Sequence, residues 1–168
     1  MDYRRIDESL FLKKLVLSDA QALFDQVEKN RSYLREWLPW LDYNKTPSDS
    51  EHYIVNTTNQ WGIFYNQNLV GAIGLHKIDQ ANKNTSIGYW LDQDVNGKGI
   101  MTRATESLID YCFHDLNLHR IEIRCAEFNM KSRAIPQRLG FTQEGLLRDV
   151  EWLYDHFVSH IVYSKIKS

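Results

Sequence analysis

A Gly-Lys-Gly turn, Gly97-Lys98-Gly99, stands between an apolar strand pattern and a helical pattern. Glycine adopts positive φ without steric cost and lets the backbone approach a ligand closely. The first N–H groups of the following helix have no partner within that helix, and the helix dipole adds about half a positive charge at the same end. These residue types at this spacing predict a site for a phosphate group.

Two better-known phosphate motifs do not fit this turn. A dinucleotide fingerprint needs a third glycine three residues after Gly99, where the sequence has Thr102. A nucleoside triphosphate loop needs a four-residue gap followed by Gly-Lys-Ser/Thr, and neither the gap nor the hydroxyl is present. The turn therefore argues against hydride transfer from a dinucleotide and against phosphoryl transfer.

The composition of the chain fits one globular domain. Its 168 residues are 43% hydrophobic, and 20 basic against 22 acidic residues give a net charge of −2. A nucleic-acid-binding protein usually has a basic face. No stretch approaches the ~20 apolar residues of a membrane span, and the N-terminus lacks the apolar run of a signal peptide. We therefore expect a single cytoplasmic domain over residues 1–168 that binds neither nucleic acid nor membrane.

The two cysteines, Cys112 and Cys125, both lie in apolar patterns. Their spacing matches neither a zinc site nor a disulfide framework. We expect both to be small core residues and expect no metal.

Strand and helix patterns alternate along the chain without a linker or repeat, which is typical of one α/β domain. The strand patterns cover residues 10–17, 61–65, 69–78, 85–91, 120–126, 142–150 and 156–166. The helical patterns follow Ser18-Asp19, cover residues 31–38, begin after Pro47-Ser48 with a capping box of Ser48 and Glu51, and cover residues 99–116 and 131–139. Pro136 should kink the last helix unless it falls early within it.

Several segments, in order along the chain, are similar to one family. Residues 96–101 resemble the acetyl-coenzyme A motif Gln/Arg-x-x-Gly-x-Gly/Ala of the GNAT acetyltransferase superfamily, with Asn96 and Met101 as departures. Residues 37–41, Trp-Leu-Pro-Trp-Leu, are similar to the first half of the RimJ/RimL-type enzymes. The segments similar to their second half are residues 117–122, 129–135, 138–141 and 144–145. The resemblance thus covers nearly the whole chain.

This resemblance implies an α/β (α+β) GNAT fold, with a mostly antiparallel central sheet splayed between its fourth and fifth strands and flanked by helices. Acetyl-coenzyme A would lie in the splay, its pantetheine arm pairing with residues 86–91 like an added strand. The implied cofactor residues are Trp90, Leu91, Asn96, Gly97, Lys98, Gly99, Ile100, Met101, Thr102, Asn129 and Ser132. Lys98, Arg103, Lys131 and Arg133 are candidates for its outer phosphate, although each alone is more often an ordinary surface charge. Asn129 is equally well explained as a helix N-cap.

The resemblance also implies two catalytic residues. Ser132 occupies the serine position of an Asn-x-x-Ser helix start and would donate a hydrogen bond to the departing thiolate. Glu151 follows the Gly-Phe and Glu-Gly segments and would take the proton of the acceptor amine, directly or through water. The competing structural explanations are a helix cap for Ser132 and a surface carboxylate for Glu151.

Aromatic residues flank the acceptor entrance in this family. The residues expected to bind the acceptor are Trp37, Trp40, Tyr154 and His156, with Tyr43 nearby, although core packing explains the tryptophans as well. At pH 7, deprotonating an α-amine with pKa near 8 costs about 1.4 kcal/mol, against about 4.6 kcal/mol for a lysine. A carboxylate base therefore suits a peptide N-terminus.

The resulting hypothesis is acetyl transfer from acetyl-coenzyme A to the N-terminal α-amine of a ribosomal protein, by direct attack in a ternary complex. Two alternatives stay open. The acceptor is a small amine such as a polyamine or an aminoglycoside, or the chain is a non-catalytic module that binds acyl-coenzyme A or a peptide. A homodimer is also compatible with the family.

Overall fold

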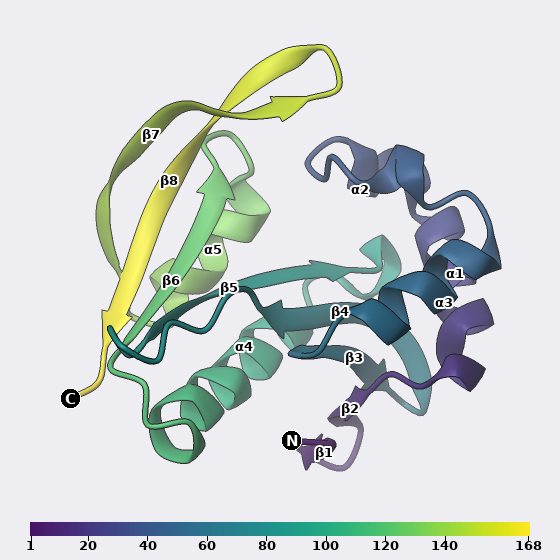
Figure 1. Cartoon of the computed structure of the whole chain (residues 1–168), viewed down its shortest axis with the longest axis horizontal. Helices are drawn as coiled ribbons and strands as arrows, with labels where there is room; N and C mark the ends of the chain where they lie inside the picture. Colours follow the sequence, from purple (N-terminus) through teal and green to yellow (C-terminus); the bar gives the residue numbers. More distant parts are fainter. The chain divides into compact units, whose positions relative to one another are not determined.

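Eight strands form one sheet in the order β1-β2-β3-β4-β5-β6-β8-β7, accompanied by five α-helices (Figure 1). This computed structural model describes residues 1–168. The strands are β1 (Tyr3–Arg5), β2 (Leu10–Lys14), β3 (Gln60–Tyr65), β4 (Asn68–Leu75), β5 (Asn84–Leu91), β6 (Arg120–Ala126), β7 (Thr142–Leu153) and β8 (His156–Ile166). The helices are α1 (Ala20–Lys29), α2 (Arg31–Arg35), α3 (Pro47–Asn56), α4 (Ile100–Asp110) and α5 (Met130–Arg138). The predicted α/β class is confirmed.

Short helical turns complete the chain. They are the 3-10 turns η1 (Leu17–Asp19), η2 (Leu41–Tyr43) and η3 (Gln93–Val95), and the π-helical turn η4 (Tyr111–Asp115). The helix predicted over residues 99–116 is therefore α4 followed by η4. The predicted strands at 10–17 and 69–78 and the predicted helix at 31–38 all end earlier than expected, and β1 was not predicted.

Two compact units make up the chain. The first comprises Met1–Gly74 and Tyr89–Ile100, and the second comprises Leu75–Gly88 and Met101–Ser168. In the first unit, β1, β2, β3 and β4 form an antiparallel meander. Asn66 and Gln67 have φ of 48° and 67° at the β3–β4 turn, which suits a two-residue hairpin. The buried core cluster beneath these strands is Leu15, Leu23, Phe64 and Leu69.

The capping box of α3 differs from the prediction. It is formed by Thr46 and Asp49, and not by Ser48 and Glu51. Pro47 takes the first helical position, where its fixed φ fits and its missing N–H is not needed. The cap therefore falls on the residue before the proline, two residues earlier than predicted.

In the second unit, β6, β8 and β7 pair antiparallel. β7 and β8 form a long twisted hairpin, and α5 lies beside β6 (Figure 1). Cys125 pairs with Ile161 and Ala126 pairs with His160. Because successive strand residues point to opposite faces, the Cys125 and His160 side chains lie on opposite faces of this sheet. The helix α5 continues through Pro136, its seventh residue, to Arg138.

β5 and β6 are parallel, and their pairing is short. It runs from Asn84↔Arg120 to Ile87↔Ile123 and then stops. Residues 88–91 of β5 and 124–126 of β6 are outside this register. The strands predicted at residues 85–91 and 120–126 therefore pair only over the first part of each strand.

An ion-pair network crosses the three C-terminal strands. Glu144 on β7 accepts a hydrogen bond of 2.6 Å from Oγ of Ser164 on β8 and forms a bidentate pair with Arg120 on β6, at 2.7 and 2.6 Å. These contacts, the Arg120 pair foremost, lower the pKa of Glu144 from 4.5 to about 2. Glu122 pairs with the same Arg120 at 2.7 Å.

This network makes the free energy of unfolding depend on pH in the acidic range. The Glu144 pKa is lower in the folded state, so its stabilisation is complete above about pH 4.5 and is lost as pH falls toward 2. We expect the free energy of unfolding, measured with urea between pH 5 and 2.5, to fall less steeply in Glu144→Gln than in the wild type. Glu106→Gln, at an exposed position of α4, is the matched control. Equal slopes in Glu144→Gln and the control would contradict this role.

Candidate active site

The predicted phosphate turn has the expected backbone in the first unit. Gly97 and Gly99 have φ of 78° and 68°. A Cβ added at either glycine would meet no protein atom within 4 Å. The turn leads directly into α4 at Ile100, so the N–H groups of its first turn face the region before the helix. An open glycine turn at a helix N-terminus fits the pyrophosphate of a coenzyme A.

Lys98, between the two glycines, is exposed. Its Nζ lies 5.7 Å from the ring centroid of Tyr65. The ammonium therefore lies over the Tyr65 ring, and Lys98 adds a positive charge to the residues that precede the N-terminus of α4.

The segment before the turn is anchored by the junction of α1 and α2. Nζ of Lys29 lies 2.6 Å from Oδ2 of Asp92, and Oδ1 of Asn30 accepts a hydrogen bond of 3.0 Å from the Gln93 N–H. Nδ2 of Asn96 donates to the Tyr33 hydroxyl at 3.0 Å. Asn96, a departure from the family motif, thus fixes the entrance of the turn.

This anchor includes a charged pair that sequence reasoning missed. Burial acts to raise the pKa of Asp92, but hydrogen bonds from Lys29 and from the Asp94 N–H outweigh it and lower that pKa. The same contact, together with a second to Asp94, raises the pKa of Lys29. No sequence motif indicates this pairing, because its partners are 63 residues apart.

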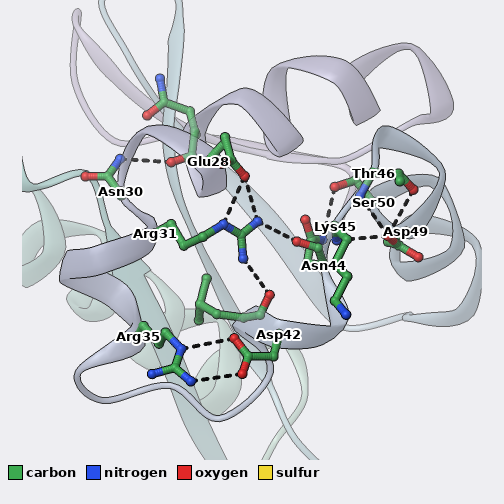
Figure 2. A network of polar contacts seen from close by, with 12 residues as sticks. Glu28, Asn30, Arg31, Arg35, Asp42, Asn44, Lys45, Thr46, Asp49 and Ser50 are labelled. Atoms are coloured by element: carbon green, nitrogen blue, oxygen red, sulfur yellow. Dashed lines mark hydrogen bonds and ion pairs between the residues drawn. The ribbon is translucent and has the colours of Figure 1, made fainter.

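Two arginines hold the segment that carries Trp37 and Trp40 (Figure 2). Arg31 on α2 donates to the Leu41 and Asn44 carbonyls at 2.6 and 2.5 Å, and also to Glu28. Arg35 makes a bidentate pair with Asp42, with both contacts at 3.0 Å. α2 and η2 are thereby tied together around the intervening tryptophans.

Packing accounts for part of this aromatic segment. The Trp40 ring lies 6.3 Å from that of Trp90, at an interplanar angle of 55°. Both rings pack against the buried cluster of Val27, Leu34 and Leu41. Leu91, the other cofactor candidate on β5, is itself buried. Trp37 is partly exposed, whereas Tyr43 is 82% exposed.

Ser132 lies in the first turn of α5 in the second unit. Asn129 is the N-cap residue, and its Oδ1 accepts the Ser132 N–H at 3.1 Å. The Ser132 hydroxyl donates to Sγ of Cys125 at 3.3 Å. Both cysteines are buried, as expected, and neither forms a disulfide. The hydroxyl is thus held beside a sulfur atom. Arg133, a phosphate candidate, donates to the Tyr163 hydroxyl and the Glu127 carbonyl.

Glu151 lies on β7 and contacts a residue that sequence reasoning missed. Its Oε2 is 3.0 Å from Nε2 of His160 on β8. His156 pairs with Leu153, so it shares the Glu151 face, and its Nδ1 lies 2.7 Å from Oδ1 of Asp155. Tyr154 lies at the hairpin turn with φ of 60°.

The two candidate catalytic groups lie on opposite faces of one sheet. Ser132 contacts Cys125, whereas Glu151 contacts His160, which pairs with the next residue, Ala126. A hydroxyl donor for a leaving sulfur and a carboxylate base for an incoming amine can therefore act from opposite sides of the β6 end.

No group of three or more His, Cys, Asp and Glu side chains that could hold a metal ion is present. No helix is long and apolar enough to cross a membrane.

The chain matches a family model described as an acetyltransferase (GNAT) domain over residues 9–142. It is 34% identical over 177 residues to YdaF of Bacillus subtilis (strain 168), which is named as an N-acetyltransferase, covering 97% of this chain and 94% of the relative. Among solved structures it is similar to RimL, the ribosomal L7/L12 alpha-N-protein acetyltransferase, with coenzyme A held by a disulfide to one of its cysteines. The TM-score is 0.93 at 26% identity, covering 98% and 97% of the two chains.

A second solved structure is the microcin C7 self-immunity acetyltransferase MccE in complex with acetyl-CoA and AMP. Its TM-score is 0.92 at 30% identity, covering 96% of this chain and 94% of MccE. Both solved relatives hold the coenzyme that the glycine turn fits. With the family model, the fold and the turn in agreement, the chain belongs to the GNAT acetyltransferase family and is an N-acetyltransferase that uses acetyl-coenzyme A as its co-substrate.

Proposed function

We propose that this enzyme acetylates the N-terminal α-amine of a ribosomal protein, with the two units acting as one catalytic domain. The observation that carries the proposal is the placement of Ser132 and Glu151 on opposite faces of the β6–β8–β7 sheet. RimL, whose structure is similar over nearly the whole chain, is named for α-amine acetylation of ribosomal protein L7/L12.

Acetyl-coenzyme A supplies the acetyl group as a thioester: an N–C bond forms at its carbonyl carbon, the C–S bond breaks, the nitrogen gives up a proton and the thiolate gains one. The turn at Gly97 and Gly99 and the first N–H groups of α4 would hold the pyrophosphate. Asn129 would both cap α5 and reach the pantetheine arm. The chain's own task is to place a base and a hydrogen-bond donor.

Glu151 is the proposed base. It is partly buried, and His160 is the one side chain that hydrogen-bonds to its carboxylate. Oε2 faces His160, so Oε1 is available to an incoming ammonium. A carboxylate attracts the ammonium before it accepts its proton, which favours an α-amine over the more basic lysine side chain.

Ser132 is the proposed donor to the leaving sulfur. A serine hydroxyl is a weak acid, so its contribution is a hydrogen bond to the developing thiolate. Its observed partner, Sγ of Cys125, shows that the hydroxyl can donate to sulfur at this place. In the RimL complex a cysteine is joined to coenzyme A, so a similar fold places a thiol within reach of the coenzyme sulfur.

Replacing Ser132 separates this role from helix capping. Ser132→Ala should lower kcat by about tenfold to a hundredfold with acetyl-coenzyme A affinity within a few-fold, because the hydrogen bond strengthens only as charge develops on sulfur. The control is Asn129→Ala, which removes the observed cap and should cost about 1 kcal/mol of stability. If Ser132→Ala loses stability and keeps its turnover, the residue is structural only.

The substrate class is tested by thiol release from acetyl-coenzyme A. The panel is a peptide with a free N-terminus and no lysine, a lysine-containing peptide with a blocked N-terminus, a polyamine and an aminoglycoside. Turnover of the first peptide alone supports the proposal. Turnover of the small amines alone would overturn the substrate class but not the acetyl-transfer chemistry. If none of the four compounds leads to thiol release, only the binding-module alternative would remain.

The MccE complex supports a second class of acceptor, an amine linked to a nucleotide. That relative was solved with AMP beside acetyl-CoA, so a similar fold accommodates a nucleotide. Adding AMP to the peptide assay tests this class: competitive inhibition against the peptide would point to a nucleotide-linked amine as the acceptor.

A further inference from the structure

His160 contacts the proposed base, Glu151, and has no role of its own in the acetyl transfer described above. Its Nε2 lies 3.0 Å from Oε2 of Glu151, and the side chains are 18% and 26% exposed. Neither residue forms another side-chain hydrogen bond. The two groups are therefore paired only with each other, in a partly desolvated place.

A bulge in β7 lies next to this pairing. On one side of it Glu151 pairs with Val158, and on the other Leu147 pairs with His160. Asp149 in between has φ of 48° and donates its N–H to Oγ of Ser159. A regular hairpin would place Asp149 opposite His160, so the bulge moves Asp149 away and leaves Glu151 diagonal to the imidazole.

The other charged groups of this sheet face have partners of their own. On β6, Glu122 pairs with Arg120 and Arg124. On β7, Glu144 pairs with Arg120. On β8, His156 pairs with Asp155. On this face, Glu151 is thus the carboxylate whose partner is His160 alone.

We propose that His160 is a positioning residue for Glu151: its Nε2–H donates to Oε2 and fixes the carboxylate so that Oε1 faces the acceptor nitrogen. The inference rests on the proposed function, because it assigns a second residue to the same base. A carboxylate has several rotamers, and a misplacement of about 1 Å can cost about a hundredfold in rate. One fixed hydrogen bond removes that freedom.

Two neutral amides test the position of the donor. In His160→Gln the side-chain NH2 reaches the place of Nε2, and in His160→Asn it reaches only the place of Nδ1. We expect His160→Asn and His160→Leu to lower kcat/KM for the peptide by about tenfold to a hundredfold. The decrease in log kcat/KM should be smaller in His160→Gln than in His160→Asn by at least about a third. KM for acetyl-coenzyme A should stay within about threefold in all three variants.

A purely structural role would give a different pattern. It would lower the unfolding temperature and raise KM for both substrates, without distinguishing Gln from Asn. Equal activity of His160→Gln and His160→Asn, or wild-type activity in His160→Leu, would overturn the proposal.

A double substitution separates this inference from the proposed function. Because His160 acts through Glu151, His160→Leu should cause no further loss of activity in a Glu151→Gln background. If the two losses multiply, His160 does not act through Glu151, and the base assignment stands without it. If Glu151→Gln alone is as active as the wild type, the base assignment itself fails.

Discussion

Glu151→Gln is expected to lose at least about a hundredfold in kcat on a peptide with a free N-terminus at pH 7. General base catalysis contributes about a hundredfold to ten-thousandfold, and glutamine cannot accept the proton. The substitution keeps the size of the side chain, and its amide oxygen can still accept the hydrogen bond from His160. Acetyl-coenzyme A should bind as it does to the wild type.

The pH dependence of this variant identifies the cause of the loss. As pH rises, more of the acceptor arrives already neutral, so the deficit of Glu151→Gln should shrink. A steady-state pH–rate profile from pH 6 to 9.5 measures this. The matched control is Glu122→Gln on the same sheet face, whose carboxylate is held by Arg120 and Arg124. Profiles of Glu151→Gln and wild type that superimpose would eliminate Glu151 as the base.

Local patterns were sufficient to predict most elements of the fold. β6 (Arg120–Ala126) and β8 (His156–Ile166) begin and end at the predicted residues. In β6, apolar and polar residues alternate from Arg120 to Cys125, which is typical of a strand. The glycine turn at residues 97–99 was also predictable, since only glycine adopts its φ values of 78° and 68° at low cost. Ends set by tertiary packing, such as that of β4 at Leu75, were predicted too far along the chain.

The site residues that escaped prediction depend on contacts across the fold. His160 meets Glu151 across the β7–β8 hairpin, where a bulge keeps Asp149 away from His160, and no residue type between 148 and 150 predicts that bulge. Tyr33 meets Asn96 across 63 residues. Ser132 and Asn129, in contrast, contact each other within one helical turn, so their spacing was enough to propose them together.

Gly99→Val is expected to abolish the thermal stabilisation by acetyl-coenzyme A. A ligand at one hundred times its Kd stabilises the wild type by about 2.7 kcal/mol. Valine has a Cβ, which would project into the space where the backbone must approach the pyrophosphate. That space holds no protein atom within 4 Å, so the valine clashes with no neighbour in the free protein. The remaining cost is backbone strain at φ of 68°, about 1 to 3 kcal/mol.

A substitution at a second glycine, Gly140, is the control for the effect of backbone strain. Gly140, at the end of α5, has φ of 71°, and a Cβ there would come no closer than 3.6 Å to Nζ of Lys165. Gly140→Val should therefore lower the unfolding temperature of the free protein about as much as Gly99→Val, while keeping the full shift with acetyl-coenzyme A. Differential scanning fluorimetry with and without the coenzyme measures both the unfolding temperature of the free protein and its shift on binding acetyl-coenzyme A. A full coenzyme-induced shift in Gly99→Val would refute the assignment of this turn to the pyrophosphate, because a branched side chain at that position leaves the backbone N–H groups no room to hold it.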